Sequence, residues 1–253
     1  MQIVGYDVGD SAEDAALSIV EDGRVRRIEL TPGTELAYTL GERWCAGART
    51  DDGHRSCDRP AAPYCPLHTS TWPCARCRGD CEKPLTSCDE EHAIYLAAFA
   101  PAVFKVGVTR SWRLQTRLRE QGAARAAHVG TVADGRIARQ LEAEYAADYG
   151  IVDRVRVPTK VAGLAESVDE AAWIDLLDAF DPIDTFAFDY GFSLSRNPVP
   201  ETVLSGTVVG VQGRVLVLEA GGTTYAVDLR DLVGYGVDET KSERRLQSSL
   251  DAF

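Results

Sequence analysis

The sequence predicts an α+β protein in which a zinc-binding, cysteine-rich segment precedes a three-stranded sheet with helices, with short β-strand segments on either side. Three observations lead to this prediction. All seven cysteines lie between positions 45 and 88. The region from 92 to 150 switches between strand-like and helix-like spacing of apolar residues. Short apolar runs separated by glycine turns occupy both ends of the chain.

The N-terminal segment, residues 1–44, reads as short strands. Three strand-like runs occur in it, at 2–6, 16–20 and 25–30. Asp22-Gly23 and Pro32-Gly33 separate them, and both dipeptides are typical of turns. The first residues lack the basic region and apolar core of a secretory leader, and so we expect a cytoplasmic protein.

The cysteine-rich segment, residues 45–91, has the spacing of metal ligands. Its seven cysteines and His68 make eight ligands, which fill about two tetrahedral structural zinc sites. The ligands that we group in the first site are Cys45, Cys57, Cys65 and His68. Those grouped in the second site are Cys74, Cys77, Cys81 and Cys88. An interleaved partition of the same ligands stays open.

Two other interpretations of the cysteines have less support than metal binding. The odd number of cysteines, the absence of a secretory signal and the C-x2-C spacing argue against a disulfide framework. A redox or zinc-trafficking role would need an exposed thiol of low pKa. His54 and His92 are left over, and we interpret both as surface residues or as partners of the ligands.

Regular structure follows the cysteines, in the segment 92–160. The spacing predicts strands at 93–99, 103–108 and 127–132, a helix at 112–120 and a second helix at 134–150. Thr109 or Ser111 could cap the first helix, and Asp134 the second. Ile137, Leu141 and Tyr145 would form the buried face of the second helix.

This order of elements, with these residues, resembles the GIY-YIG nuclease superfamily. Ala93-Ile94-Tyr95 stands where that family has GIY, and Lys105-Val106-Gly107 stands where it has YIG. Arg117 and Glu142 match the family's helix arginine and metal-binding glutamate. The resemblance implies catalytic roles for Tyr95, Lys105, Arg117 and Glu142, with Mg²⁺ or Mn²⁺ at Glu142.

A closer resemblance covers more of the chain. Cys81-Glu-Lys-Pro, Cys88 and His92 are followed by Lys105-Val-Gly-Val-Thr-Arg110 and Gln121-Gly-Ala123. This order is similar to an uncharacterised domain-of-unknown-function family that joins a cysteine cluster to a GIY-YIG-like core. That family implies no established activity.

The charge is distributed unevenly along the chain. The net charge is −12, and only four of the 27 basic residues are lysine. A salt-adapted, halophilic cytoplasm would explain this composition, and so would a GC-biased genome. The segment 92–160 alone is basic, with 6 acidic and 11 basic residues. Overall acidity therefore does not exclude a nucleic-acid partner.

Three arginines of this segment could contact nucleic acid. Arg110, Arg113 and Arg117, at i, i+3 and i+7, could form one cationic stripe on a helix, or a solvated face.

The rest of the chain contains fewer functional signals. We expect a helical connector at 161–200, with a helix over 164–180, and a tail at 241–253. Strand-like runs at 203–211, 214–219 and 225–229 predict a small barrel or curled sheet over 201–240.

Two hypotheses for function follow. The first is a zinc-binding, nucleic-acid-binding protein with a divergent GIY-YIG-like core, with metal-dependent phosphodiester hydrolysis (an endonuclease activity) left open. The second is a zinc-stabilised protein-interaction module without catalysis. No run of 18 apolar residues is present, and so we expect no membrane partner.

Overall fold

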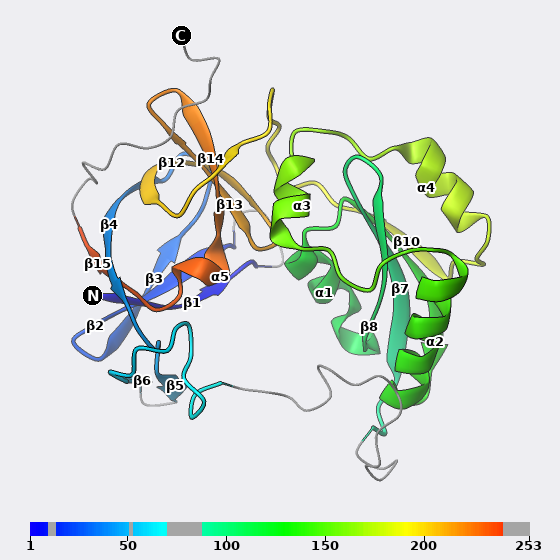
Figure 1. Cartoon of the computed structure of the whole chain (residues 1–253), viewed down its shortest axis with the longest axis horizontal. Coiled ribbons are helices and arrows are strands. Elements are labelled where there is room, and N and C mark those ends of the chain that lie inside the picture. The colour runs from blue at the N-terminus through cyan, green and yellow to red at the C-terminus, as the bar shows by residue number, and fades with distance from the viewer. Residues whose placement is uncertain (10–13, 51–52, 70–87, 240–253) are drawn as a thin grey trace. The chain divides into compact units, whose positions relative to one another are not determined.

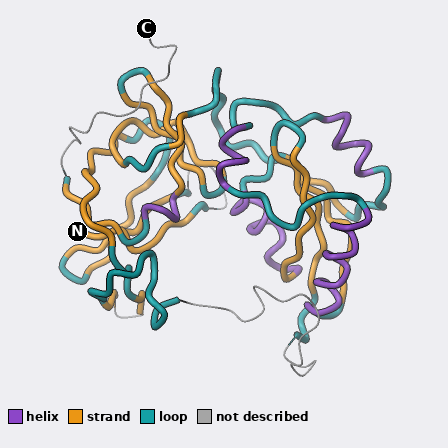
Figure 2. The backbone as a smooth tube through the Cα atoms, in the orientation of Figure 1, coloured by secondary structure: helices purple, strands orange, loops and turns teal. Residues whose placement is uncertain are grey.

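The computed structural model describes residues 1–9, 14–50, 53–69 and 88–239. The chain divides into two compact units, a first unit of residues 1–70 and 190–253 and a second unit of residues 71–189. Both contain strands and helices; strands prevail in the first unit, whereas the described part of the second unit has four α-helices beside its sheet (Figures 1 and 2). No helix in these described ranges is long and apolar enough to cross a membrane.

The first unit is built on one nine-stranded sheet. Its pairing order is β11-β14-β13-β12-β4-β15-β1-β2-β3. The N-terminal strands are β1 (Gln2–Asp7), β2 (Ala16–Glu21), β3 (Arg24–Glu29) and β4 (Glu35–Arg43). The C-terminal strands are β11 (Val199–Pro200), β12 (Leu204–Gln212), β13 (Val215–Ala220), β14 (Thr223–Asp228) and β15 (Tyr235–Asp238). A short helix, α5 (Leu229–Leu232), precedes β15.

Pairing between distant segments joins the two ends of the chain. Strand β4 pairs with β12 through Tyr38 and Leu204 and with β15 through Leu40 and Val237. The segments 1–44 and 201–240 therefore share one sheet and one apolar core, which includes Ile3, Leu17, Leu204 and Leu216. Within the described residues the pairing order has two ends, at β11 and β3. The C-terminal strands thus belong to an open sheet, and the small-barrel alternative is wrong.

The second unit contains a four-stranded antiparallel sheet in the order β10-β9-β7-β8. Its strands are β7 (His92–Phe99), β8 (Val103–Arg110), β9 (Arg125–Val132) and β10 (Asp184–Ala187). Its helices are α1 (Leu114–Gln121), α2 (Gly135–Asp148), α3 (Val157–Ala162) and α4 (Glu170–Leu177). The predicted strand–strand–helix–strand–helix order over 92–150 is confirmed.

Alternation along β7 separates two apolar clusters. Ala93, Tyr95 and Ala97 pack with Leu114 and Leu118 of α1. Ile94, Leu96 and Ala98 pack with residues of α2 and α4, among them Leu141, Tyr145 and Trp173. Side chains of a strand point alternately to its two faces, so α1 covers one face of the sheet and α2 the other (Figure 1).

Several local predictions need correction. Helix α1 begins at Leu114 without a side-chain cap, because Thr109 and Arg110 stay paired in β8 and Ser111–Arg113 form a 3₁₀ turn. Arg110 is therefore not part of a helical stripe. Ile137 is 42% exposed, and Ala138 takes the buried position on α2. The helix expected at 164–180 is limited to α4.

The residues predicted to cap the start of α2 and to end α1 are confirmed. The Asp134 carboxylate accepts hydrogen bonds from the N–H groups of Arg136 (2.8 Å) and Ile137 (2.9 Å). Gly122 ends α1 in the left-handed conformation, with φ of 72°.

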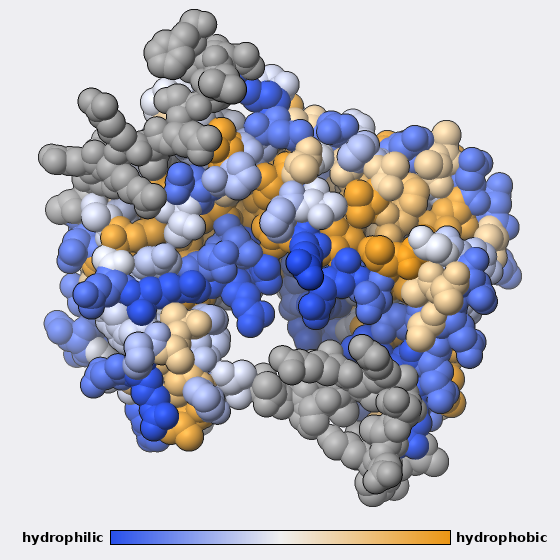
Figure 3. Space-filling model, viewed as in Figure 1, coloured by the Kyte–Doolittle hydropathy of each residue, from blue (hydrophilic) through white to orange (hydrophobic). Residues whose placement is uncertain are grey.

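On the surface of the second unit, apolar residues gather around α4 (Figure 3), where Ile174 is 55% exposed.

Candidate functional site

Four predicted metal ligands lie together in the first unit. The ligand atoms of Cys45, Cys57, Cys65 and His68 are all within 4.8 Å of one another. His68 Nδ1 lies 3.3 Å from Cys45 Sγ and 3.4 Å from Cys65 Sγ. The sulfurs of Cys57 and Cys65 are 4.0 Å apart. The four residues grouped from their spacing are therefore close enough to hold a metal ion.

These distances are close to those expected for tetrahedral coordination. With Zn–S of about 2.3 Å and Zn–N of about 2.0 Å, ligand atoms in a tetrahedral site lie about 3.5–3.8 Å apart. The observed distances of 3.3, 3.4 and 4.0 Å fall on either side of this range. A disulfide would need sulfurs about 2.05 Å apart. Three thiols and one imidazole are also the donor set of a closed structural zinc site.

The first ligand is held where β4 ends. The N–H of Cys45 donates to Arg59 O (2.8 Å), and the N–H of Ala46 donates to Pro63 O (2.9 Å). The buried carboxamide of Gln2 donates to the carbonyls of Cys45 (3.3 Å) and Gly234 (3.1 Å). The sheet thus fixes Cys45 against the segment that carries the other ligands.

A turn brings two of the other ligands, Cys65 and His68, close together. The N–H groups of His68 and Thr69 both donate to Cys65 O at 2.9 Å. This one-turn geometry directs the Cys65 and His68 side chains to the same side, as the C-x2-H spacing predicts. Cys65, like Cys45, is fully buried.

The loop after Cys45 depends on a glycine. Gly47 has a φ of +67°, and a Cβ atom there would lie 2.1 Å from Arg55 O. Two short strands follow, β5 (Ala48–Thr50) and β6 (Gly53–Arg55), which pair antiparallel. His54, in β6, has its Nε2 2.6 Å from Ala46 O and so contacts the backbone of the loop. His92 makes a similar contact with Glu90 O, at 2.6 Å from Nδ1.

The thiols of the cluster influence one another. Burial acts to raise the pKa of Cys65, but contacts with the backbone of Leu67 and His68 and with Cys45 and Cys57 lower it to about 7. For Cys57 a backbone contact at Arg59 acts to lower the pKa, yet burial and the neighbouring thiols raise it. A divalent cation would stabilise all the thiolates together.

The second predicted zinc site cannot be placed in the same way. Cys74, Cys77 and Cys81 lie outside the described residues. Cys88 is described and, like Cys45, Cys57 and Cys65, forms no disulfide within the described ranges. The second site therefore stays a prediction.

Three of the four predicted catalytic residues lie together in the second unit. Tyr95 is 1% exposed, and Lys105 Nζ lies 5.6 Å from the centre of its ring. Gln121 Nε2 donates a hydrogen bond to Tyr95 Oη. Burial acts to lower the pKa of Arg117, but Tyr95 and Glu120 raise it. We call Tyr95, Lys105, Arg117 and Gln121 the Tyr95 cluster.

Glycine makes this cluster possible. Gly107, on β8, pairs with Tyr95, and a Cβ atom at Gly107 would lie 2.5 Å from Tyr95 Oη. Lys105 is 7% exposed and has no carboxylate within 4.0 Å among the described residues. It is a buried cation beside a phenol.

Glu142 is separate from the Tyr95 cluster. It lies on α2, which packs on the other face of the sheet, and it is 7% exposed. Its carboxylate forms an ion pair with Arg139 at 2.5 Å. One carboxylate already matched by an arginine is a poor ligand set for Mg²⁺ or Mn²⁺, which prefer several oxygens.

The predicted nucleic-acid-binding arginines are paired with acids. Glu120 contacts both Arg113 (2.6 Å) and Arg117 (3.0 Å). Arg110 forms an ion pair with Glu90 at 2.5 Å. All three pairs are partly exposed, so their net stabilisation is small and the guanidinium groups stay accessible to anions.

Sequence reasoning missed three features. Lys160 of α3 supports the Tyr95 cluster, since its Nζ donates to Gln121 O at 2.5 Å. Trp112 is 74% exposed beside the arginines.

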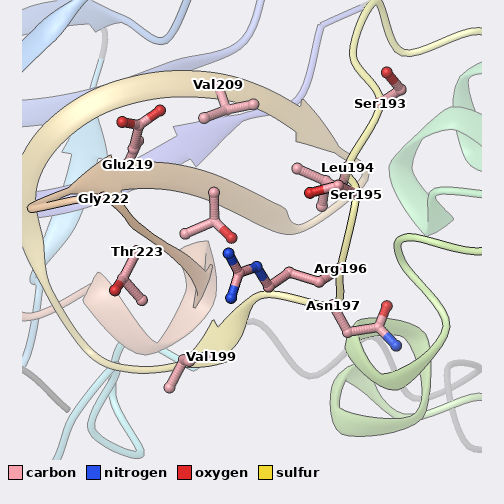
Figure 4. Close-up of a pocket in the computed structure, with 11 residues that line it drawn as sticks. Ser193, Leu194, Ser195, Arg196, Asn197, Val199, Val209, Glu219, Gly222 and Thr223 are labelled. Atoms are coloured by element: carbon pink, nitrogen blue, oxygen red, sulfur yellow. The ribbon is translucent and has the colours of Figure 1, made fainter. Parts of the chain in front are cut away.

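The third feature is a hollow of about 280 Å³ in the first unit. Its lining includes Ser193, Ser195, Arg196 and Thr223. Figure 4 shows Arg196 reaching into this hollow. A single tryptophan or an aperiodic loop gives no motif to recognise.

Comparison with known proteins gives one match. A family model described as a protein of unknown function (DUF2797) matches residues 56–188, which is more than half of the chain. The matched range includes Cys57, Cys65, His68 and the whole four-stranded sheet, and it starts after Cys45. No curated protein and no solved structure matches the chain.

Proposed function

The chain belongs to the DUF2797 family of proteins of unknown function, and from this premise we propose that it is a zinc-stabilised, nucleic-acid-binding protein with a divergent GIY-YIG-like core. The convergence of Cys45, Cys57, Cys65 and His68 carries the zinc part of the proposal. These ligands link the end of β4 to a segment with little apolar material, where metal ligation replaces a core.

The basic side chains of the second unit support nucleic-acid binding. Lys105 is a buried cation without a carboxylate within 4.0 Å among the described residues. Arg110, Arg113 and Arg117 lie around the start of α1, each paired with one acid, either the exposed Glu90 or the partly buried Glu120. A phosphate backbone offers closely spaced negative charge that can compete with single carboxylates.

Hydrolysis is the less favoured form of this proposal. The Tyr95 hydroxyl is buried and hydrogen-bonded to Gln121, and Glu142 is paired with Arg139 on the other face of the sheet. A cation at Glu142 would first have to displace Arg139. Binding without cleavage therefore fits the geometry better than a metal-dependent endonuclease.

A protein-interaction module without catalysis is the second candidate. The observation that favours it is the pairing of Arg110, Arg113 and Arg117 with Glu90 and Glu120, which reduces the positive charge available to phosphates. In this case the zinc site would have a purely structural role.

The test uses the zinc-loaded full chain with labelled single- and double-stranded DNA and RNA, in a KCl series with Mg²⁺ or Mn²⁺. We expect binding that weakens with salt, with a log–log slope of about −0.7 to −0.9 per phosphate contacted. R117Q should reduce that slope by about one unit. Cleavage that is lost in E142A would instead establish a nuclease. Absence of binding at every salt concentration would leave the protein-interaction module.

A further inference from the structure

Trp112 is the most exposed large apolar side chain in the described part of the chain. It is 74% exposed, ahead of Leu67 at 70% and Ile183 at 57%. It lies in the 3₁₀ turn Ser111–Arg113, between β8 and α1. A tryptophan left in water does not contribute the stabilisation of the fold that its burial would give. The packing of the second unit does not explain this position.

The backbone on both sides of Trp112 is anchored. The N–H of Ser111 donates to Glu91 O at 3.0 Å, and Arg110 forms an ion pair with Glu90 at 2.5 Å. Leu114, two residues after the tryptophan, is 7% exposed and packs in the core below α1. The indole therefore projects from a turn that is anchored on both sides.

Trp112 lies among three arginines, each of which also forms an ion pair with Glu90 or Glu120. The guanidinium carbon of Arg113 lies 5.9 Å from the centre of the Trp112 ring, within the range of a cation–π contact. Arg110 ends β8 just before the turn, and Arg117 follows on α1. The other strongly exposed apolar residues of this unit, such as Ile137, Ile174 and Ile183, are on or after α2. Tryptophan and arginine are enriched in protein interfaces as well. The choice of nucleic acid rests on the basic balance of residues 92–160, since an aromatic ring can stack on a base while arginines contact phosphates.

We propose that Trp112 is a stacking platform for an unpaired nucleic-acid base, with Arg110, Arg113 and Arg117 contacting the flanking phosphates. The inference rests on the nucleic-acid binding proposed above and specifies its substrate class as single-stranded DNA or RNA. Bases of an intact duplex are stacked on their neighbours and are not available to the indole. Single strands, loops and ends expose such bases.

The experiment measures binding of a fluorescein-labelled 12-nucleotide single strand and of the duplex of the same sequence, with DNA and RNA forms of both. W112A should weaken single-strand binding at least about fivefold, since stacking on an aromatic side chain contributes about 1–3 kcal/mol per base. Duplex binding should change by less than twofold, and W112F should fall between W112A and the unmodified protein. The salt slope should not change, because Trp112 carries no charge.

I174A is the matched control, because Ile174 is an exposed apolar residue on another helix. It should leave both affinities unchanged. Quenching of tryptophan fluorescence by the unlabelled single strand provides a direct second measurement, and W112F should abolish most of it.

Three results overturn the inference in different ways. Single-strand affinity that is equal in W112A and the unmodified protein removes the stacking role and leaves the proposed function intact. Equal losses for single strand and duplex would mean that Trp112 contacts the backbone or a groove. Absence of any binding by the unmodified protein would refute the proposed function, and the inference with it.

Discussion

Individual residues of the metal cluster differ in ways that a simple count of cysteines and histidines cannot show. Cys45 and Cys65 are fully buried, while Cys57 and His68 are partly exposed. His54 is only a few residues from Cys57 in the sequence, yet its Nε2 lies 2.6 Å from a backbone carbonyl, outside the group of four ligands. The geometry thus separates ligands from a histidine that supports their loop.

We predict that C65S binds one equivalent of zinc less than the unmodified protein. The serine hydroxyl is a poor zinc ligand, and the remaining three donors leave the ion open to water. H54A is the control and should keep the full zinc content. Both values can be measured by elemental mass spectrometry after gel filtration. Equal zinc in C65S and the unmodified protein would rule out a zinc site at this cluster.

Gly107 has a role that depends on close packing. Its position in the Lys105-Val106-Gly107 triplet places its backbone against the ring of Tyr95. An alanine methyl group at 2.5 Å from the phenol oxygen cannot be accommodated unless the buried ring moves.

G107A should therefore reduce the free energy of unfolding by about 1–3 kcal/mol, the usual effect of overpacking. The matched control is G130A, on β9 of the same sheet, where the new methyl group would meet Ile94 Cδ1 at an ordinary 3.7 Å. Urea unfolding of both variants measures the difference. If the two variants are equally stable, Tyr95 is less constrained than its contacts imply.

At the scale of elements, helices α1 and α2, which pack on opposite faces of β7, begin differently. Helix α2 has a capping carboxylate at Asp134, whereas α1 follows a 3₁₀ turn and has no side-chain cap. The first turn of α2 therefore depends on one side chain, and that of α1 depends on the preceding turn.

D134A should lower the stability of the second unit by about 1 kcal/mol, because two N–H groups of α2 lose their acceptor. D134N keeps the acceptor oxygen and should cost clearly less. Thermal unfolding followed by circular dichroism would show the order of the three proteins. A loss in D134N as large as that in D134A would mean that the negative charge, rather than the hydrogen bonds, stabilises the helix start.

At the scale of the whole molecule, the net charge of −12 has a measurable consequence. Repulsion among acidic side chains opposes folding, and salt shortens its range from about 10 Å at 0.1 M to about 3 Å at 1 M. The same excess of acidic residues is the reason for predicting a salt-adapted cytoplasm.

We expect the melting temperature to rise as KCl increases from 0.1 to 1 M and to level off once screening is complete. Differential scanning calorimetry on the zinc-loaded chain measures this rise. A melting temperature that is independent of KCl would contradict the electrostatic explanation. A rise that continues in proportion to concentration would instead indicate exclusion of the salt from the protein surface.

The sequence by itself determined the features that depend on neighbouring residues. The Cys65-Pro-Leu-His68 spacing, the cap at Asp134, the glycine end of α1 and the alternation along β7 could all be predicted, because turns and periodic faces are local properties. The order of strands and helices over 92–150 was predictable for the same reason.

Only the tertiary structure decided which distant segments meet. Pairing of β4 with β12 and β15 merges the two ends of the chain into one sheet, and no local pattern encodes that choice. The same holds for the start of α1, where pairing of Arg110 with His92 in the sheet prevails over helix formation. It holds also for Glu142, which the packing of α2 carries to the face opposite Tyr95. Contacts between residues far apart in sequence depend on the sum of burial over whole elements, which a short window of residues does not contain.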